Sequence, residues 1–260
     1  MTKYNVILCG PVGSGKTSSL RTVPGPLFVI ATEPGIESIL DHANNIEGGT
    51  PWAKARHWAF IPPADPDWST MIDNANKLNK FTQEQLMKMP GVNRQDYTQF
   101  ISVLNTCANL KCDICGEKFG AMDHLGPEWT VAVDGLSGLS TMSMDLVAGG
   151  KPVKTQADWG SAMDNVERLV MKWTGSTKCN FVLVSHLDRE YDELTGGTKL
   201  MVSTLGRKLA PRIPRFFDEV VYCHRAGTEF FWSSTEANVD TKVRRLPFSD
   251  KIKPDFGQLK

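Results

Sequence analysis

Residues 9–20, CGPVGSGKTSSL, follow the apolar run Val6-Ile7-Leu8 and decide the fold. From Gly10 to Thr17 they match G-x-x-x-x-G-K-[ST] in full. The motif stands after an expected strand at residues 4–9 and before an expected helix at residues 17–22. Glycines let the backbone of such a loop curl until successive N–H groups point at a phosphate. The sequence therefore predicts a loop that binds a nucleoside triphosphate.

The loop also provides two side chains for phosphate chemistry. We expect Lys16 to bridge the β- and γ-phosphate oxygens and the Thr17 hydroxyl to ligate Mg²⁺. The other interpretation, a fortuitous glycine turn, does not account for the strand and helix on either side. The residues expected to bind the nucleotide are Gly10, Pro11, Val12, Gly13, Ser14, Gly15, Lys16, Thr17 and Ser18.

Two further apolar runs end in an acidic residue. Residues 27–32 lead to Glu33, and residues 129–133 lead to Asp134. Since the carboxyl ends of parallel strands form the ligand crevice, both acids should lie beside the phosphate loop. We expect Asp134 to hold Mg²⁺ through water and Glu33 to activate the attacking water. The alternative for Glu33 is a cap on a helix at residues 36–43.

A fourth apolar run, residues 180–184, ends in Ser185 and His186. His186 is a candidate sensor of the γ-phosphate, and the alternative is an ordinary histidine at the sheet edge. Residues 220–223 and 229–232 predict a β-hairpin, followed by Lys242 and Arg244. These two cations are candidate fingers for the γ-phosphate of a neighbouring subunit.

The composition is that of an ordinary globular domain. The chain has 260 residues, 41% of them hydrophobic, and 29 basic residues balance 29 acidic ones. Nucleic-acid contact would therefore need local clustering of charge. No secretory signal or membrane span is recognisable, so we expect a cytoplasmic protein, in the host cytoplasm if the gene is carried by a phage. Six irregularly spaced cysteines do not predict a disulfide framework.

The span between the two acids is longer than one crossover needs, which predicts an insertion at about residues 46–128. Residues 46–68, rich in tryptophan and proline, predict an ordered irregular segment, and helices are expected at 69–80 and 93–110. Cys112-x-x-Cys115 is half of a structural zinc site. Cys107 and His124 are the candidate further ligands, in a knuckle spanning residues 107–124. The alternative is a glycine-bearing hairpin with free thiols.

Basic residues gather in the second half of the chain, within an expected exposed loop at 146–160 and beyond the fourth run. They are candidate contacts to a phosphate backbone, and the alternative is a solvated helical face. The residues in question are Lys151, Lys154, Arg189, Lys199, Arg207, Lys208, Arg212 and Arg215.

With the phosphate loop, the motifs FVIATEPG (28–35), VAVDGLSGL (131–139) and FVLVSH (181–186) stand in an order that resembles the RecA-like core ATPases. QADWGSAMDNVERL (156–169) and GGTKLMVSTLGRKLAPRIPRFFDEV (196–220) are similar to phage-encoded AAA-domain nucleotide-binding proteins, which include Sak-type single-strand annealing ATPases. The resemblance extends over nearly the whole chain.

The resemblance implies a single α/β domain over residues 1–260, with a mostly parallel twisted sheet of the RecA-like P-loop type. It also implies Mg-ATP hydrolysis, rings or filaments with ATP between subunits, and a role in phage recombination. Glu33 matches the family's catalytic glutamate. Residues 148–160 and 187–204 fall where RecA proteins carry their DNA-binding loops.

Three hypotheses follow. The first is an ATPase, stimulated by single-stranded DNA, that anneals strands. Annealing is favoured over strand exchange because the sequence starts at its first strand, without an oligomerisation segment before it. The second is a nucleotide-switched loader or assembly factor for a replication protein. The third is a small-molecule kinase, disfavoured because no acceptor pocket or arginine-rich lid is recognisable. The expected partners are single-stranded DNA, further copies of the chain and a phage single-strand binding or replication protein; no membrane partner is expected.

Overall fold

The computed structural model describes residues 3–35, 39, 55–89, 96–192 and 196–259. A seven-stranded sheet has the order β11-β10-β1-β7-β6-β2-β3, and β11 alone among these strands runs antiparallel to its neighbour. The strands are β1 (Asn5–Cys9), β2 (Leu27–Ala31), β3 (Arg56–Phe60), β6 (Thr130–Asp134), β7 (Asn180–Ser185), β10 (Glu219–Ala226) and β11 (Glu229–Ser233). The predicted α/β fold class is confirmed.

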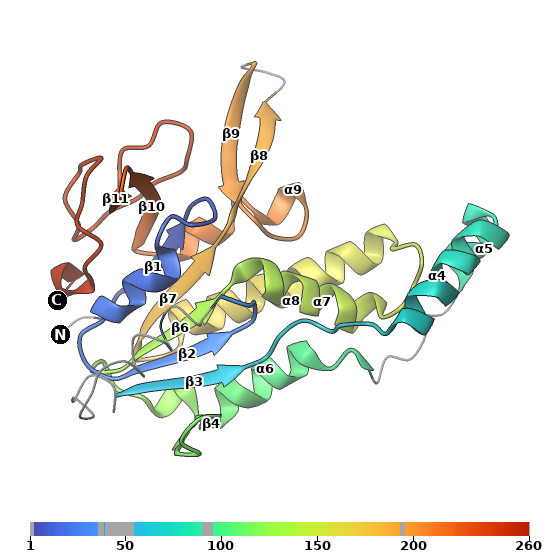
Figure 1. The fold of residues 1–260 in the computed structure, drawn as a ribbon, viewed down its shortest axis with the longest axis horizontal. Coiled ribbons are helices and arrows are strands. Elements are labelled where there is room, and N and C mark those ends of the chain that lie inside the picture. The colour runs from blue at the N-terminus through green and yellow to red at the C-terminus, as the bar shows by residue number, and fades with distance from the viewer. Residues whose placement is uncertain (1–2, 36–38, 40–54, 90–95, 193–195, 260) are drawn as a thin grey trace.

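The central strands are buried on both faces, as expected of a parallel sheet covered on two sides. Their side chains alternate between two cores: Ile7 contributes to one, and Val6 and Leu8 to the other. On the first face pack α6 (Gln99–Ala108), α7 (Leu136–Ala148) and α8 (Gln156–Gly175) (Figure 1). The second core contains residues of the short helices η1 (Leu20–Thr22) and η5 (Phe256–Leu259).

A two-stranded hairpin projects from the carboxyl edge of the sheet. It consists of β8 (Leu187–Asp192) and β9 (Gly197–Val202), and β8 begins two residues after β7 ends (Figure 1). The short helices α9 (Gly206–Leu209) and η4 (Ile213–Phe216) follow it. The hairpin is therefore directly connected to the centre of the sheet.

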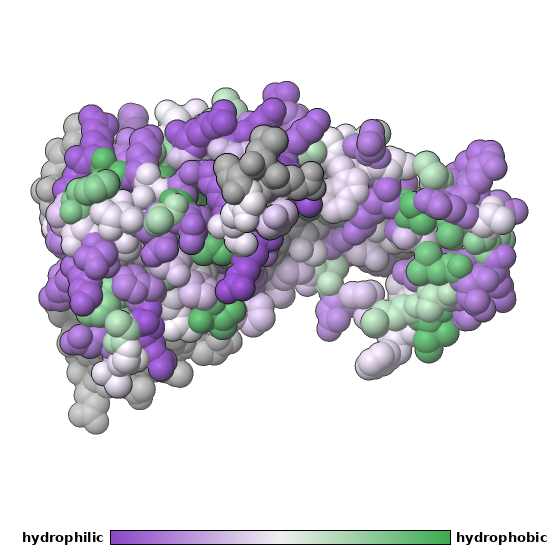
Figure 2. Space-filling view, turned by 90° about the horizontal axis from the view of Figure 1, so that it is seen from above, coloured by the Kyte–Doolittle hydropathy of each residue, from purple (hydrophilic) through white to green (hydrophobic). Residues whose placement is uncertain are grey.

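A helical arm extends away from the sheet, formed by α4 (Trp68–Lys80) and α5 (Gln83–Lys88) (Figure 1). The helix expected at 69–80 is confirmed, but no residue of α4 is buried. Figure 2 shows apolar side chains at this end of the molecule. The exposed ones are Trp68, Met71, Ile72, Leu78, Phe81 and Met87.

The structure corrects two expectations. Part of the segment expected to be irregular forms β3, which pairs with β2 and belongs to the main sheet. The loop expected at 146–160 is only seven residues long, 149–155, because α7 runs to Ala148 and α8 begins at Gln156. Thr155 and Asp158 form a capping box that starts α8. None of the helices in the described ranges combines the length and apolarity needed to cross a bilayer.

Candidate nucleotide-binding site

The phosphate loop connects β1 to the short helix α1 (Lys16–Ser19). Gly13 and Gly15 have φ angles of 73° and 79°, which side chains rarely adopt. A Cβ on Gly10 would also lie 2.3 Å from the Cys223 carbonyl oxygen. Helix α1 has no side-chain cap, so the N–H groups at its start are available to an anion. The loop therefore needs its glycines and is built to hold a phosphate.

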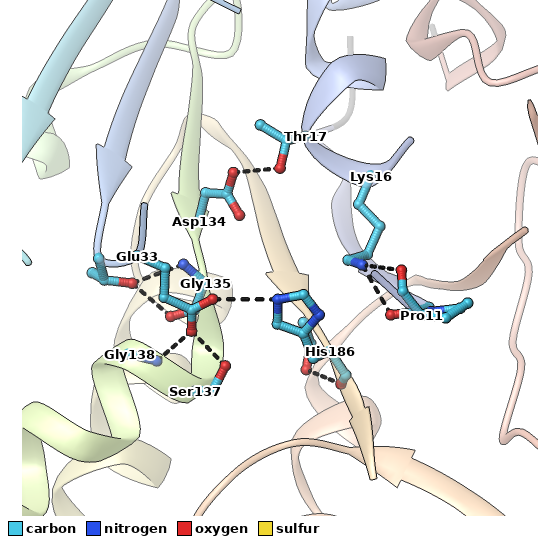
Figure 3. Close-up of polar contacts among 12 residues, drawn as sticks. Pro11, Lys16, Thr17, Glu33, Asp134, Gly135, Ser137, Gly138 and His186 are labelled. Atoms are coloured by element: carbon cyan, nitrogen blue, oxygen red, sulfur yellow. Dashed lines mark hydrogen bonds and ion pairs between the residues drawn. The ribbon is translucent and has the colours of Figure 1, made fainter. Parts of the chain in front are cut away.

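Lys16 lies beneath this loop and is 5% exposed. Its Nζ donates to the carbonyl oxygens of Gly10 (2.9 Å) and Pro11 (2.7 Å) (Figure 3). Burial lowers the pKa of the Lys16 ammonium, because the charged form is poorly solvated there. Both carbonyls are neutral, and no ion pair to Lys16 is found among the residues that the structure describes. Phosphate oxygens are therefore natural partners for its charge.

The two predicted magnesium ligands lie side by side. Thr17 Oγ1 donates to Asp134 Oδ2 over 2.6 Å. Burial raises the pKa of the Asp134 carboxyl; the Thr17 hydroxyl opposes this shift, and the charge of Glu33 adds to it. A hydroxyl and a buried carboxylate that converge from two elements are a donor set that suits Mg²⁺, which binds oxygen ligands. The residues present therefore fit this ion.

The ends of β2 and β6 are locked together at this edge. The buried Thr32 hydroxyl donates to the Gly135 carbonyl oxygen (2.6 Å) and accepts from the Gly135 N–H (2.7 Å). The Thr32 N–H donates to the Asp134 carbonyl oxygen over 2.6 Å. These bonds fix the two acids, Glu33 and Asp134, relative to one another.

Glu33 is held at the start of α7. Its Oε1 accepts hydrogen bonds from the Ser137 hydroxyl and the Gly138 N–H, while its Oε2 lies 3.4 Å from His186 Nε2 (Figure 3). The alternative considered for Glu33 was a cap on the helix expected at 36–43, of which only residue 39 lies within the described ranges. Glu33 does bind a helix start, but that of α7, and one of its oxygens still faces the cleft.

His186 stands between the phosphate loop and Glu33, because β7 lies between β1 and β6. Its carbonyl oxygen accepts from the Ser203 N–H (2.8 Å), just beyond β9, so both ends of the projecting hairpin meet at this residue. The cleft is lined by Val12, Gly13, Ser14, Gly15, Lys16, Thr17, Ser18, Glu33, Pro34, Gly35, Asp134, Val184 and His186. The predicted loop residues 12–18, Glu33, Asp134 and His186 therefore converge on one cleft, whereas Gly10 and Pro11 do not line it.

Sequence reasoning missed Ser137 and Gly138. Ser137 is the second residue of the helix that follows Asp134, and a serine so close to a helix start is a signal that could have found it. Phe230 of β11 was also missed, and a Cβ on Gly15 would lie 2.7 Å from its ring. Nothing in the sequence connects Phe230 to a loop more than 200 residues earlier.

The candidate fingers lie away from this cleft. The backbone of Lys242 pairs with Val220, near the amino end of β10, whereas the phosphate loop follows the carboxyl end of the parallel strand β1. Lys242 Nζ donates to the Phe217 carbonyl oxygen (2.6 Å), and Arg244 forms an ion pair with Asp218 (3.5 Å). Neither residue lines the cleft of this chain, so their role as fingers stays a prediction.

Half of the predicted DNA-contacting cations form ion pairs within the chain. The pairs are Lys151–Asp158 (2.9 Å), Lys199–Asp240 (2.8 Å), Arg207–Glu190 (3.4 Å) and Arg212–Glu167 (3.1 Å). Lys154 is exposed and interacts electrostatically with Asp145. Arg189, Lys208 and Arg215 are exposed and form no ion pair among the residues that the structure describes. These last three are the cations best placed for an external phosphate.

The expected zinc ligands are only partly brought together. Cys112 and Cys115 lie with His57, which was not predicted, whereas Cys107 and His124 are not in this group. Cys107 packs against the core and accepts from Trp173 Nε1 over 3.4 Å. His124 lies in a separate short helix, η3 (Met122–His124). The four-residue set is therefore wrong in these two members.

A phosphate loop on a mostly parallel sheet, with the threonine and the two acids that magnesium nucleotides require at its carboxyl edge, defines the class of P-loop nucleotide-binding ATPase domains. A family model described as "AAA domain" matches residues 2–245, and the chain belongs to this family.

No curated protein matches the sequence. Among solved structures, one similar chain is described under "Structural and biochemical analysis of a prototypical ATPase from the type III secretion system of pathogenic bacteria". It is 11% identical, with a TM-score of 0.39, and the match covers 86% of this chain and 53% of that one. The chain thus spans about half the length of that ATPase.

Proposed function

We propose that this protein is a Mg-ATP-hydrolysing recombination ATPase of the RecA-like core type that acts on single-stranded DNA, with strand annealing as its activity. The observation that carries the proposal is the contact between Glu33 and His186. It joins a candidate base to the residue from which the β8–β9 hairpin leaves the sheet. A role in phage recombination follows from the family resemblance.

The hydrolytic step uses the oxygen of Glu33 that faces the cleft. Oε1 is held by Ser137 and Gly138, so Oε2 is the oxygen that accepts a proton from the water that attacks the γ-phosphorus, once the γ-phosphate draws His186 away from it. Lys16 neutralises charge on the β- and γ-phosphates. Mg²⁺, held by Thr17 and through water by Asp134, would supply further charge stabilisation. The products are ADP and inorganic phosphate.

Coupling to DNA would pass through His186. A γ-phosphate in the cleft would compete with Glu33 for the His186 imidazole. When the γ-phosphate leaves, His186 would contact Glu33 again. Because the His186 carbonyl binds Ser203, such a change would act on both ends of the hairpin. Arg189 on β8 and Lys208 on α9 are exposed cations that can hold a phosphate backbone. We expect DNA binding to strengthen when ATP is bound.

The first test is steady-state ATP hydrolysis with and without single-stranded DNA at low and moderate salt. We expect several-fold stimulation that weakens with salt, because released counterions drive phosphate contacts. Glu33→Gln should retain ATP binding and lower the rate by about 10²–10⁴-fold. Turnover at the wild-type rate in this variant would remove Glu33 as the base.

The DNA surface is tested separately with Arg189→Ala and Lys208→Ala. The matched control is Lys88→Ala, which removes an exposed lysine from α5 on the helical arm. The first two variants should weaken DNA binding and flatten its salt dependence, and the control should do neither. Equal behaviour of all three variants would contradict this DNA surface.

One observation favours the second hypothesis, a nucleotide-switched loader for a replication protein. The ion pairs of Lys151, Lys199, Arg207 and Arg212 reduce the net positive charge of the proposed DNA surface. An ATPase rate that single-stranded DNA leaves unchanged, with no DNA retained in the presence of ATP, would favour the loader. Stimulation by a replication protein would then identify the partner.

A further inference from the structure

A histidine from the edge of the main sheet meets two cysteines of a small hairpin far from the phosphate loop. We propose that His57, Cys112 and Cys115 bind a structural zinc ion. One ligand atom from each residue lies within 4.8 Å of the other two, and His57 Nδ1 is 3.8 Å from Cys115 Sγ. Ligand atoms of a tetrahedral zinc site are about 3.5–3.8 Å apart, given Zn–S and Zn–N distances of about 2.3 and 2.0 Å. The group is therefore close to the size that the ion requires.

The backbone around the two cysteines forms a tight turn. The Gly116 N–H donates to the Cys112 carbonyl oxygen over 2.9 Å. The Cys112 N–H bonds to the Glu117 carbonyl oxygen (2.9 Å), and Gly116 takes a φ of 75° to close the turn. These bonds hold the two cysteines in one tight turn, as a Cys-x-x-Cys zinc site requires.

The third ligand is fixed by the contacts between the hairpin and β3. The Asp113 N–H donates to the Trp58 carbonyl oxygen (2.8 Å), and the Phe60 N–H donates to Asp113 Oδ2 (2.7 Å). The ring of His57 packs 4.3 Å from that of Phe119, centroid to centroid. His57 and Cys112 are 5% and 1% exposed. Contacts outside the group thus hold the ligands in place, as neighbouring hydrogen bonds and packing do around bound metals.

The position of the group assigns it a structural role. His57 is paired in register with Phe28, the second residue of β2, whereas Glu33 follows the other end of that strand. The proposed zinc is therefore at the edge of the sheet opposite the ATP cleft. A water can complete the tetrahedron around the ion.

The decisive measurement is the metal content of the full-length protein purified without chelators. We expect about one zinc per chain, as structural sites of this kind hold. Cys112→Ser, Cys115→Ser and His57→Gln should each weaken zinc binding at least 10-fold, measured by competition with a chromophoric chelator. Cys107→Ser and His124→Gln are the matched controls and should keep the wild-type stoichiometry. Loss of zinc in either control comparable with the loss in Cys112→Ser would overturn the ligand assignment.

A second measurement on the wild-type protein does not depend on the variants folding. Cobalt added after chelation should give thiolate-to-cobalt charge-transfer absorption and the strong visible bands of tetrahedral coordination. Failure to take up zinc or cobalt would overturn the proposal, as would a Cys112–Cys115 disulfide found by mass spectrometry in the freshly purified protein. Glu33→Gln should still bind zinc, so failure of the ATPase proposal is distinguishable from failure of this one.

Discussion

Replacing Gly138 by alanine is expected to displace the candidate base. A Cβ at this position would lie 2.2 Å from the Thr32 carbonyl oxygen and 2.8 Å from Glu33 Cγ. The carbonyl belongs to the backbone and cannot rotate away like a side chain. The start of α7 and the end of β2 must therefore separate, and Glu33, held between them, moves with one or the other.

Two magnitudes follow. Inserting a methyl group into a packed interior costs typically about 1–3 kcal/mol of stability. A misplacement of the reacting groups by about 1 Å lowers the rate by on the order of 10²-fold. We expect Gly138→Ala to lose about 1–3 kcal/mol of stability and on the order of 10²-fold in hydrolytic rate. The affinity for a non-hydrolysable ATP analogue should stay within a few-fold of wild type, because Lys16 and the phosphate loop are untouched.

Gly160 is the matched control. It lies within α8, and a Cβ there would meet nothing within 4 Å. Gly160→Ala should therefore stabilise the protein by roughly 0.5–1 kcal/mol and leave the rate unchanged. Urea unfolding and steady-state hydrolysis measure both effects. If Gly138→Ala retains the wild-type kcat, or if both variants shift stability in the same direction, the close packing of Gly138 against Thr32 and Glu33 does not set the position of Glu33.

Three further predictions concern the cleft. Lys16→Ala should weaken nucleotide binding by 2 kcal/mol or more, about 30-fold, in a fluorescent-nucleotide titration; unchanged affinity would contradict its phosphate contact. Burial raises the pKa of Asp134, so its ionisation makes the nucleotide-free protein less stable as the pH rises from 3.8 upward through the raised pKa. Asp134→Asn should therefore stabilise this form at neutral pH by on the order of 1 kcal/mol and abolish Mg²⁺-dependent hydrolysis; unfolding curves that show destabilisation would refute the first part. His186→Ala should reduce the stimulation by DNA more than the basal rate, and an equal loss of both rates would place His186 in the hydrolytic step alone.

The sequence predicts the centre of this fold well because buried parallel strands are read directly as apolar runs. The strands ending at Cys9, Asp134 and Ser185 lie within one residue of their expected bounds at each end. Strand β3 was missed since its first residues are Arg56 and His57, and such residues do not signal a buried strand. Both are buried all the same, and Arg56 donates to the Val23 carbonyl oxygen over 2.6 Å.

The sequence identifies the acids of the cleft because each follows a strand, but it does not identify what holds them. The partners of Glu33 are a serine and a backbone N–H more than 100 residues away, and no spacing rule connects them. The same limit applies to the proposed zinc group. Cys112 and Cys115 are a local motif, whereas His57 is 58 residues from Cys115 and meets it only because β3 joins the sheet.

The proposed zinc and the ATP cleft are connected through one strand. Strand β3 is the last of the sheet, and its pairing with β2 fixes the neighbour whose carboxyl end leads to Glu33. A zinc ion bound by His57, Cys112 and Cys115 would fix β3, and through it the outer side of β2. The hydrogen bonds between Thr32 and Gly135 fix the carboxyl end of β2 against β6. The bonds between Thr32 and Gly135 act directly at the ATP cleft. The zinc ion would act from the opposite end of β2. Removal of zinc should accordingly lower stability more than it lowers the hydrolytic rate, which is the reverse of the effect expected for Glu33→Gln.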